Sequence, residues 1–254
     1  YISPITTSVG NVKLNGPLVA GGNVKNVIIT SDSSRVVYIA DQDILNTDEI
    51  YSVPIGGGAN TKLNGTIVAG GTVGNFSITP DSSRVVYRAD QDIPDTDELY
   101  ISPITTSVGN VKLNGPIVTD GSIFNFTISP NSTMIVYQGD VDTDGIIEIY
   151  SVPVRGGANI KLNGTLVAGG KVENWQISLD SSRILYIANQ ETVDSDEIYS
   201  VPVSGGANTK INGALVPGGN VSPFQFLTNN NQNNNGTVVI YKADQDILNT
   251  DELY

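Results

Sequence analysis

The residues that suggest chemistry are carboxylates, and they gather in short loops about fifty residues apart. The densest arrangement is Asp140-Val141-Asp142-Thr143-Asp144-Gly145-Ile146-Ile147-Glu148, with acids at positions 1, 3, 5 and 9 and glycine at position 6. Neighbouring carboxylates repel one another, and a bound cation relieves that repulsion. Calcium suits such a loop because it accepts roughly six to eight oxygen ligands in flexible geometry. The spacing predicts a calcium site here, with a solvated acidic turn as the alternative.

This loop, the third of five along the chain, matches the first half of an EF-hand loop. It departs from that motif at position 12, where Ser151 replaces the bidentate glutamate. The pattern resembles instead the calcium loops of integrin-type propellers, in which the ninth position supplies the last carboxylate. That resemblance implies four side-chain ligands and one backbone carbonyl, which here are Asp140, Asp142, Asp144, Glu148 and the carbonyl of Ile146.

Four further loops are acidic at equivalent places. The first, second and fifth keep aspartate at positions 1 and 3, and an aspartate at position 8 replaces the missing fifth-position ligand if the loop folds back. The candidate ligands in these three loops are Asp41, Asp43, Asp48, Asp90, Asp92, Asp97, Asp244, Asp246 and Asp251. In the fourth loop Asn189 and Glu191 replace the first pair, so it is the weakest calcium candidate.

Composition restricts the other kinds of chemistry. The five loops hold 21 of the 26 acidic residues, so the acidity belongs to one type of loop and not to the whole surface. The sequence has no Cys and no His, which excludes disulfides, thiolate or imidazole metal sites and imidazole-dependent triads. A net charge of −13 argues against a nucleic-acid partner, because phosphates require cationic groups. No apolar run approaches the roughly 20 residues of a membrane span.

The loops belong to an internal repeat. Equivalent tyrosines mark successive units at spacings of 49 to 55 residues, namely Tyr1, Tyr51, Tyr100, Tyr150, Tyr199 and Tyr254. In the unit over 73–121, the β-rich pattern predicts strands at 73–79, 84–89, 98–104 and 111–118. The acidic loop joins the second strand to the third, and Asp81 is expected to bond the backbone two residues further on.

Four short strands in each unit of about fifty residues are typical of a propeller blade. The sequence predicts an all-β fold, a β-propeller of five tandem four-stranded blades. The second strands are expected to be buried on both faces, as in Val36-Val37-Tyr38. The alternatives are a solenoid, whose coils are usually shorter, and a string of sandwiches, which need about 100 residues each.

Two segments carry a resemblance to a known family. Thr79-Pro80-Asp81-Ser82-Ser83-Arg84-Val85-Val86-Tyr87 and the equivalent segment at 179–186 resemble the WD40-like repeats of the TolB propeller family. Ile149-Tyr150-Ser151-Val152-Pro153 is similar to that family's third strand, and residues 222–226 to its first. Ser82 stands where the family has glycine. The resemblance covers all five units and implies blade architecture, but it implies little about function.

The units fall at about 1–50, 51–99, 100–149, 150–198 and 199–254 within one predicted domain, 1–254. Either the ring closes, with residues 1–19 supplying strands three and four beside residues 221–243, or the chain is a segment of a longer blade array. A closed five-bladed ring is the prediction, because it leaves no exposed strand edges.

No nucleophile elbow or phosphate-binding glycine motif is present, so the sequence predicts a protein that is not an enzyme. Near-identical repeats without a singular site favour an extracellular or cell-surface structural or adhesive protein that is calcium-stabilised and able to polymerise into a filament. Its partner would be a protein, including a second copy, or a glycan. The alternative is a lectin-like propeller, with Asn26, Asn75, Asn125 and Asn174 around a central pocket.

Overall fold

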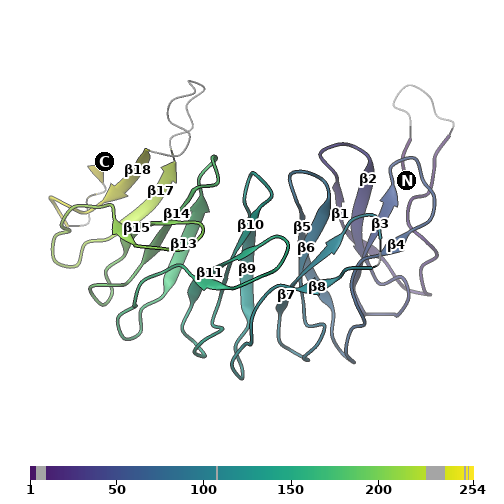
Figure 1. Cartoon of the computed structure of the whole chain (residues 1–254), viewed down its shortest axis with the longest axis horizontal. Helices are drawn as coiled ribbons and strands as arrows, with labels where there is room; N and C mark the ends of the chain where they lie inside the picture. The colour runs from purple at the N-terminus through teal and green to yellow at the C-terminus, as the bar shows by residue number, and fades with distance from the viewer. Residues whose placement is uncertain (4–9, 107, 227–237, 249, 251) are drawn as a thin grey trace. The chain divides into compact units, whose positions relative to one another are not determined.

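The computed structural model describes residues 1–3, 10–106, 108–226, 238–248, 250 and 252–254, and all regular structure in these ranges is β-strand (Figure 1). Four sheets have four antiparallel strands each in sequence order, and the fifth has three. The described part of the chain contains no helix long and apolar enough to cross a membrane. The sequence-based prediction of an all-β fold of blade-like sheets is confirmed.

The first sheet comprises β1 (Val24–Ile29), β2 (Arg35–Ala40), β3 (Glu49–Pro54) and β4 (Thr61–Lys62), and the second comprises β5 (Val73–Ile78), β6 (Arg84–Ala89), β7 (Glu98–Pro103) and β8 (Val111–Lys112). The third comprises β9 (Ile123–Ile128), β10 (Met134–Gly139), β11 (Glu148–Pro153) and β12 (Ile160–Lys161). The fourth comprises β13 (Val172–Ile177), β14 (Arg183–Ala188), β15 (Glu197–Pro202) and β16 (Thr209–Lys210). The fifth comprises β17 (Val221–Phe226), β18 (Val239–Ala243) and β19 (Glu252–Leu253).

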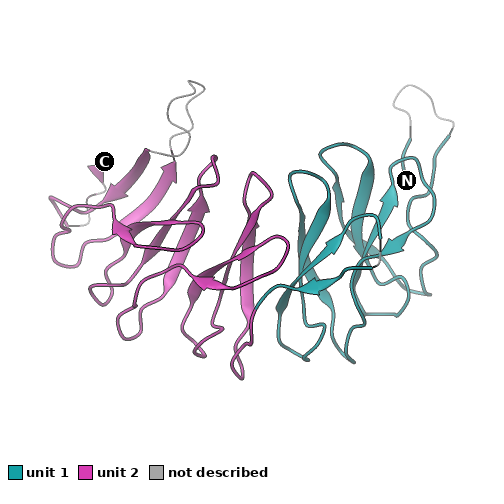
Figure 2. Ribbon diagram, in the orientation of Figure 1, with its two compact units in different colours: residues 1–114 teal, residues 115–254 magenta. Residues whose placement is uncertain are grey.

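The chain divides into two compact units, residues 1–114 and 115–254 (Figure 2). The first unit contains the first and second sheets, and the second unit contains the other three. The strands recur at the period that the sequence predicts. The single domain expected over 1–254 stays a prediction.

Within each unit, the hydrophobic core lies between consecutive sheets. We call the side of a sheet that carries Val36 and Tyr38, or their equivalents, its front face, and the side that carries Val37 and Ile39 its back face. The back face of the first sheet packs with the front face of the second, where Phe76 is 5% exposed. The same arrangement joins the third sheet to the fourth and the fourth to the fifth. In the first four sheets the second strands are therefore buried on both faces, as expected, whereas Ile240 on the back face of β18 is exposed.

The fourth strands are shorter than the sequence indicates, since β8 ends at Lys112 and not at residue 118. The side chain of Asn114 explains this difference, because its Oδ1 accepts the backbone N–H of Leu99 at 2.8 Å. A side chain therefore completes the hydrogen bonding that a longer strand would have supplied.

The described turns after the first strands, which follow β1, β5, β9 and β13, have the predicted geometry. The Asp81 carboxylate accepts the backbone N–H of Ser83 at 3.0 Å. Ser82, at the family's glycine position, is left-handed with φ 59°, and its hydroxyl accepts the backbone N–H of Asp32 in the preceding turn at 3.2 Å. Serine is strained in this conformation but links two sheets, which glycine has no side chain to do.

The closure predicted for the fifth sheet is not what the structure has. The third-strand position beside β18 is occupied by β19, through the pairs Lys242 with Leu253 and Ala243 with Glu252. Ile2 forms its isolated bridge with Val12 instead. The prediction of a closed five-bladed ring is therefore corrected to four complete sheets and one three-stranded sheet in the described residues. The Asn-rich insert at 229–235 lies outside them.

Candidate functional site

Each sheet carries a pair of stacked tyrosines on its second and third strands. Tyr38 pairs in register with Tyr51, and their ring centroids lie 5.5 Å apart. The equivalent pairs are Tyr87 with Tyr100, Tyr137 with Tyr150, Tyr186 with Tyr199, and Tyr241 with Tyr254, at 5.4 to 5.6 Å. In the first four sheets both rings are buried, so the repeated tyrosine forms part of the core.

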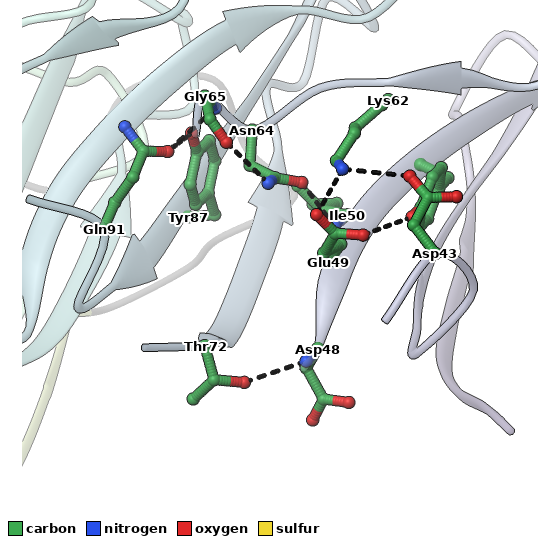
Figure 3. A network of polar contacts seen from close by, with 11 residues as sticks. Asp43, Asp48, Glu49, Ile50, Lys62, Asn64, Gly65, Thr72, Tyr87 and Gln91 are labelled. Carbon is green, nitrogen blue, oxygen red and sulfur yellow. Dashed lines mark hydrogen bonds and ion pairs between the residues drawn. The ribbon is translucent and has the colours of Figure 1, made fainter. Parts of the chain in front are cut away.

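A buried glutamate at the start of the third strand anchors a polar cluster in each of these four sheets. Figure 3 shows the cluster around Glu49 in the first sheet. The Tyr51 hydroxyl donates to Glu49 at 2.7 Å, and Glu49 also forms an ion pair with Lys62 on β4. The same Lys62 ammonium reaches Asp43 in the acidic loop at 3.0 Å. The other three clusters contain Glu98, Tyr100, Lys112 and Asp92; Glu148, Tyr150, Lys161 and Asp142; and Glu197, Tyr199, Lys210 and Glu191.

Two residues beyond the lysine, an asparagine bonds the third strand to the chain that leaves the fourth strand. We call this stretch, which begins at Gly65 in the first sheet and runs to the next sheet, the crossing segment. Asn64 Oδ1 accepts the backbone N–H of Ile50 at 2.9 Å, while its Nδ2 donates to the carbonyl of Gly65 at 2.9 Å. The equivalent bonds from strand N–H to asparagine oxygen involve Asn114, Asn163 and Asn212. The cluster therefore fixes the register of β3, β4 and the chain that leaves them.

The crossing segment is also bonded to the next sheet. In Figure 3, the Gly65 N–H donates to Gln91 Oε1 at 2.9 Å, and the Tyr87 hydroxyl donates to the same oxygen at 3.0 Å. The third sheet has Val141 at the position of Gln91, and its Tyr137 hydroxyl donates to Asn159 at 2.6 Å. The polar contacts therefore link strands within a sheet and also consecutive sheets.

Burial and neighbouring carboxylates alter the acidity of this cluster. Burial raises the pKa of Tyr51, Tyr100, Tyr150 and Tyr199 well above the usual range of a tyrosine, and the hydrogen bond to Glu49 raises that of Tyr51 further. For Tyr186 the pKa is raised to about 12 by burial. Partial burial lowers the pKa of Lys62, but the hydrogen bonds to Glu49 and Asp43 outweigh it and leave that pKa raised. These groups are stabilising cross-links at neutral pH, with tyrosines protonated and lysines charged.

The first-position aspartates of the acidic loops bind backbone N–H groups. Asp140 accepts the N–H of Ser122 at 2.7 Å and that of Gly145 at 3.1 Å. Asp41 and Asp90 accept from Asn23 and Thr72 in the same way. The N–H of Asn23 lowers the pKa of Asp41. These aspartates hold the loop against the start of the first strand.

The other predicted ligands face different partners. Asp43, Asp92 and Asp142 pair with the β4 or equivalent lysine. Asp48 pairs with Lys25 at 2.6 Å, and Asp97 with Arg88 at 3.3 Å. Asp144 is exposed, and the N–H of Ile146 donates to the carbonyl of Thr143. Asp244 is buried, the Asp246 N–H donates to Glu252, and Asp251 lies outside the described residues.

The loop geometry bears on the calcium prediction. Gly145 is left-handed with φ 75°, as a sharp turn requires, but Asn46, Asp95 and Asp194 adopt the same conformation at the same position. Within the ranges that the structure describes, no three acidic side chains converge on a point where a metal ion would sit. The Lys161 ammonium lies 2.5 Å from Glu148 and 3.6 Å from Asp142. In this arrangement one ammonium group pairs with two of the four carboxylates, and calcium at the third loop stays a prediction.

The first-strand asparagines are exposed, and two of them bond locally. Asn125 Oδ1 accepts the N–H of Phe126 at 2.9 Å, and Asn174 accepts that of Trp175 at 2.8 Å.

Two equivalent pockets lie beside the polar clusters of the first and third sheets. One is lined by Glu49, Lys62, Asn64 and residues 65–70, and the other by the equivalent residues Glu148, Lys161, Asn163 and 164–169; each has a volume of about 550 Å³.

The lysines and asparagines of the clusters were not among the residues predicted from the sequence. The signal is Lys-x-Asn after each third strand, at Lys62, Lys112, Lys161 and Lys210, together with a glutamate two residues before each third-strand tyrosine. Each of these four units therefore contains one lysine and one glutamate at repeated positions. This pattern was available in the sequence, but the partners lie 13 or 14 residues apart and meet only when β3 and β4 pair.

No protein-family model and no curated protein matches the chain. Solved structures do match. Prolyl oligopeptidase B from Galerina marginata is 12% identical with a TM-score of 0.54, over 89% of this chain and 34% of that one. Oligopeptidase B from Leishmania major is 14% identical with a TM-score of 0.52, over 72% and 25%.

TolB from Acinetobacter baumannii is 14% identical with a TM-score of 0.45, over 87% of this chain and 48% of that chain. The chain thus spans half or less of the length of these three proteins. At such identities the matches to the two peptidases show the fold alone, a repeat of propeller-type blades.

Proposed function

We propose that the chain is a non-enzymatic structural or adhesive repeat protein of the cell surface or the extracellular space. The observation that supports this proposal is that the buried acidic residues bond to neighbouring strands of the fold. In each of the first four sheets a buried glutamate bonds to a tyrosine and a lysine, and an asparagine bonds to the backbone of the third strand, so the chemistry-bearing groups cross-link the fold. A scaffold of this kind distributes its stability over nearest-neighbour contacts between repeats.

The test replaces the four glutamates one at a time, as Glu49→Gln, Glu98→Gln, Glu148→Gln and Glu197→Gln. For a structural protein we expect each variant to lose a similar part of its free energy of unfolding, measured by urea denaturation. We also expect the purified chain to leave fluorogenic prolyl peptides uncleaved, although the matched structures include peptidases. Turnover of such peptides that scales with the chain's concentration would overturn the proposal.

A lectin-like function is the second candidate, and the two equivalent pockets of about 550 Å³ favour it. Each is lined by a lysine, a glutamate and an asparagine, whose side chains can form hydrogen bonds with sugar hydroxyls. Titration calorimetry against a panel of oligosaccharides distinguishes the two functions. Saturable binding that Lys161→Ala weakens, with Lys112→Ala as the control, would replace the structural proposal by the lectin.

Calcium at the third loop is a separate proposal. It requires Asp142 to leave Lys161, and the 3.6 Å separation and the exposure of Asp142 and Asp144 make that movement inexpensive. Calcium at about 100 times its dissociation constant then adds roughly 2.7 kcal/mol to the free energy of unfolding. Thermal melts with calcium and with a chelator test this, using the double variant Asp142→Ala/Asp144→Ala as control. Equal melting temperatures for the original chain in both media would contradict calcium binding at the third loop.

A further inference from the structure

A serine hydroxyl on the third strand of the third sheet lacks the partner that its equivalents have in two other sheets. In the first sheet Arg35 Nε donates to Ser52 Oγ at 2.6 Å. In the fourth sheet Arg183 Nε donates to Ser200 Oγ at 2.7 Å. Ser151 occupies the same position and is fully buried, but its Oγ has no hydrogen-bond partner among the described residues. A hydroxyl in this state destabilises the fold, because it has lost its water and gained nothing in exchange.

One residue change within the repeat explains the missing partner. Met134 stands where the first, second and fourth sheets have arginine, and it is the only methionine of the chain. The strand register is unchanged, because Met134 pairs with Pro153 and Val136 with Ser151, as the equivalent residues do in the first and fourth sheets. Met134 and Ser151 are therefore diagonal neighbours on the back face of the third sheet, a separation that long side chains can span.

The surroundings of Met134 contain a second unpaired donor. Met134 is only partly buried, and it packs against the core between the third and fourth sheets. Trp175, on the front face of the fourth sheet, packs against the same core, and its buried Nε1–H has no acceptor among the described residues. Thioether sulfur is a weak acceptor, whereas the oxygen of a sulfoxide is strongly polar. This interface therefore holds two buried groups that lack an acceptor and one residue whose oxidation creates an acceptor.

We propose that Met134 is an oxidation site whose sulfoxide is bound by the Ser151 hydroxyl. Hydrogen peroxide transfers one oxygen atom to a lone pair of Sδ. The O–O bond breaks and an S–O bond forms, so that the sulfur is oxidised and the peroxide is reduced to water. The new oxygen is attached to Sδ as Nε of arginine is attached to Cδ, so it lies as many bonds from the backbone as the nitrogen that reaches Ser52 and Ser200. Arginine donates to the serine and the sulfoxide accepts from it, and a hydroxyl serves in either role.

The bond to Ser151 changes what oxidation does to the fold. Methionine oxidation commonly disrupts a core, because a polar group enters apolar surroundings. At Met134 the polar oxygen gains a donor and the Ser151 hydroxyl gains an acceptor, so the oxidised sheet keeps its packing. The sequence has no cysteine, so no thiol competes for the oxidant, and sulfoxide reductases can reverse the change. The third sheet is thus a reversible peroxide-modification site within the repeat.

Thermal melts of the full chain before and after hydrogen peroxide treatment test the proposal, with mass spectrometry to confirm the gain of one oxygen atom. The change in melting temperature on oxidation should be more favourable in the original chain than in Ser151→Ala, by about 2–4 °C, the effect of one hydrogen bond in a chain of this length. Before oxidation, Ser151→Ala should be at least as stable as the original chain, because it removes an unpaired buried hydroxyl. Equal changes on oxidation in the two chains would overturn the proposal.

Two control variants locate the effect. Ser200→Ala removes the equivalent serine, whose partner is Arg183, so its change on oxidation should equal that of the original chain. Met134→Leu should gain no oxygen and show no change in melting temperature. If Met134→Leu responded to peroxide as the original chain does, oxidation would act elsewhere and the proposal would be wrong.

A further variant tests the geometry without any oxidant. Met134→Arg supplies the Nε donor that Ser52 and Ser200 have, so its melting temperature should exceed that of Met134→Leu by about 2–4 °C. This gain should disappear in the double variant Met134→Arg/Ser151→Ala. An arginine that gives no gain, or a gain that persists without Ser151, would show that a side chain at position 134 does not bond this hydroxyl.

Discussion

The first and second sheets have almost the same sequence pattern and the same internal polar cluster, yet their front faces differ. Both carry the stacked tyrosine pair and the glutamate–lysine ion pair. On β5, Phe76 is buried by the back face of the first sheet, whereas on β1 the equivalent Val27 is half exposed. The difference teaches that contacts within a sheet are set by the repeat itself, while the burial of a face is set by the neighbouring sheet.

The largest expected effect is one that the two sheets share, which is loss of stability in alkali. Folding raises the pKa of Tyr51 and Tyr100 above that of an unfolded tyrosine, near 10. Above about pH 10 the unfolded chain has lost protons that the folded chain keeps, so the free energy of unfolding falls as pH rises. The raised pKa values of Lys62 and Lys210 act in the same direction. Urea denaturation between pH 8 and pH 12 should show a steep fall from about pH 10.

Tyr51→Phe and Tyr100→Phe should reduce the slope of that fall by equal amounts, because each removes one tyrosine with a raised pKa. A free energy of unfolding that stays constant up to about pH 11 would show that the tyrosine hydroxyls are not protected by folding.

The next effect separates the two sheets. Phe76→Ala empties a site in the core between the first and second sheets and should cost about 3–5 kcal/mol. Val27→Ala removes a half-exposed side chain and should cost less than about 1 kcal/mol. Urea denaturation at low protein concentration measures both. Similar losses for the two variants would mean that the front face of the first sheet is covered in the single chain.

The loss of the buried glutamate should have a smaller effect on the free energy of unfolding, and this effect should be equal in the first and second sheets. Glu49 is 3% and Glu98 1% exposed, while their lysines are about one-third exposed, so solvent screens part of each ion pair. Glu49→Gln and Glu98→Gln should each lower the free energy of unfolding by about 2 kcal/mol. Glu252→Gln is the control and should have a smaller effect, because no lysine among the described residues forms an ion pair with Glu252. Unequal losses for Glu49→Gln and Glu98→Gln would show that neighbouring sheets contribute to the cluster.

The smallest effect concerns the left-handed serines. Ser33 and Ser82 have φ 57° and 59°, and only Ser82 accepts a hydrogen bond from the preceding turn. Ser33→Gly should stabilise the chain by about 0.5–1 kcal/mol, because glycine adopts this conformation without strain. Ser82→Gly gains the same relief but loses a bond of about 1 kcal/mol, so thermal melts should show little net change. An equal gain in both variants would mean that the bond between Asp32 and Ser82 contributes nothing.

Much of the fold was predictable because the repeat imposes it. The strands at 73–78, 84–89 and 98–103 follow the predicted positions closely, since alternating β-branched residues between turn residues leave few other choices. The length of β8 was not predictable, because it depends on the Asn114 side chain meeting the N–H of Leu99. For the candidate metal site, likewise, only part of the arrangement could be predicted from the sequence. The clustering of acids is visible in the sequence, but their lysine partners come from a later strand.

The sequence by itself determined the period of the fold, the order of strands in each sheet, the turn at Asp81 and the position of the acidic loops, because these depend on residues close together in the chain. Only the tertiary structure decided where each carboxylate points. Lys161 neutralises Glu148 because β11 and β12 pair, and Asp140 turns toward Ser122 because the loop folds over the first strand. It also decided that Phe76 is buried and Val27 is not, since burial depends on which sheet lies opposite and not on the residue's own pattern.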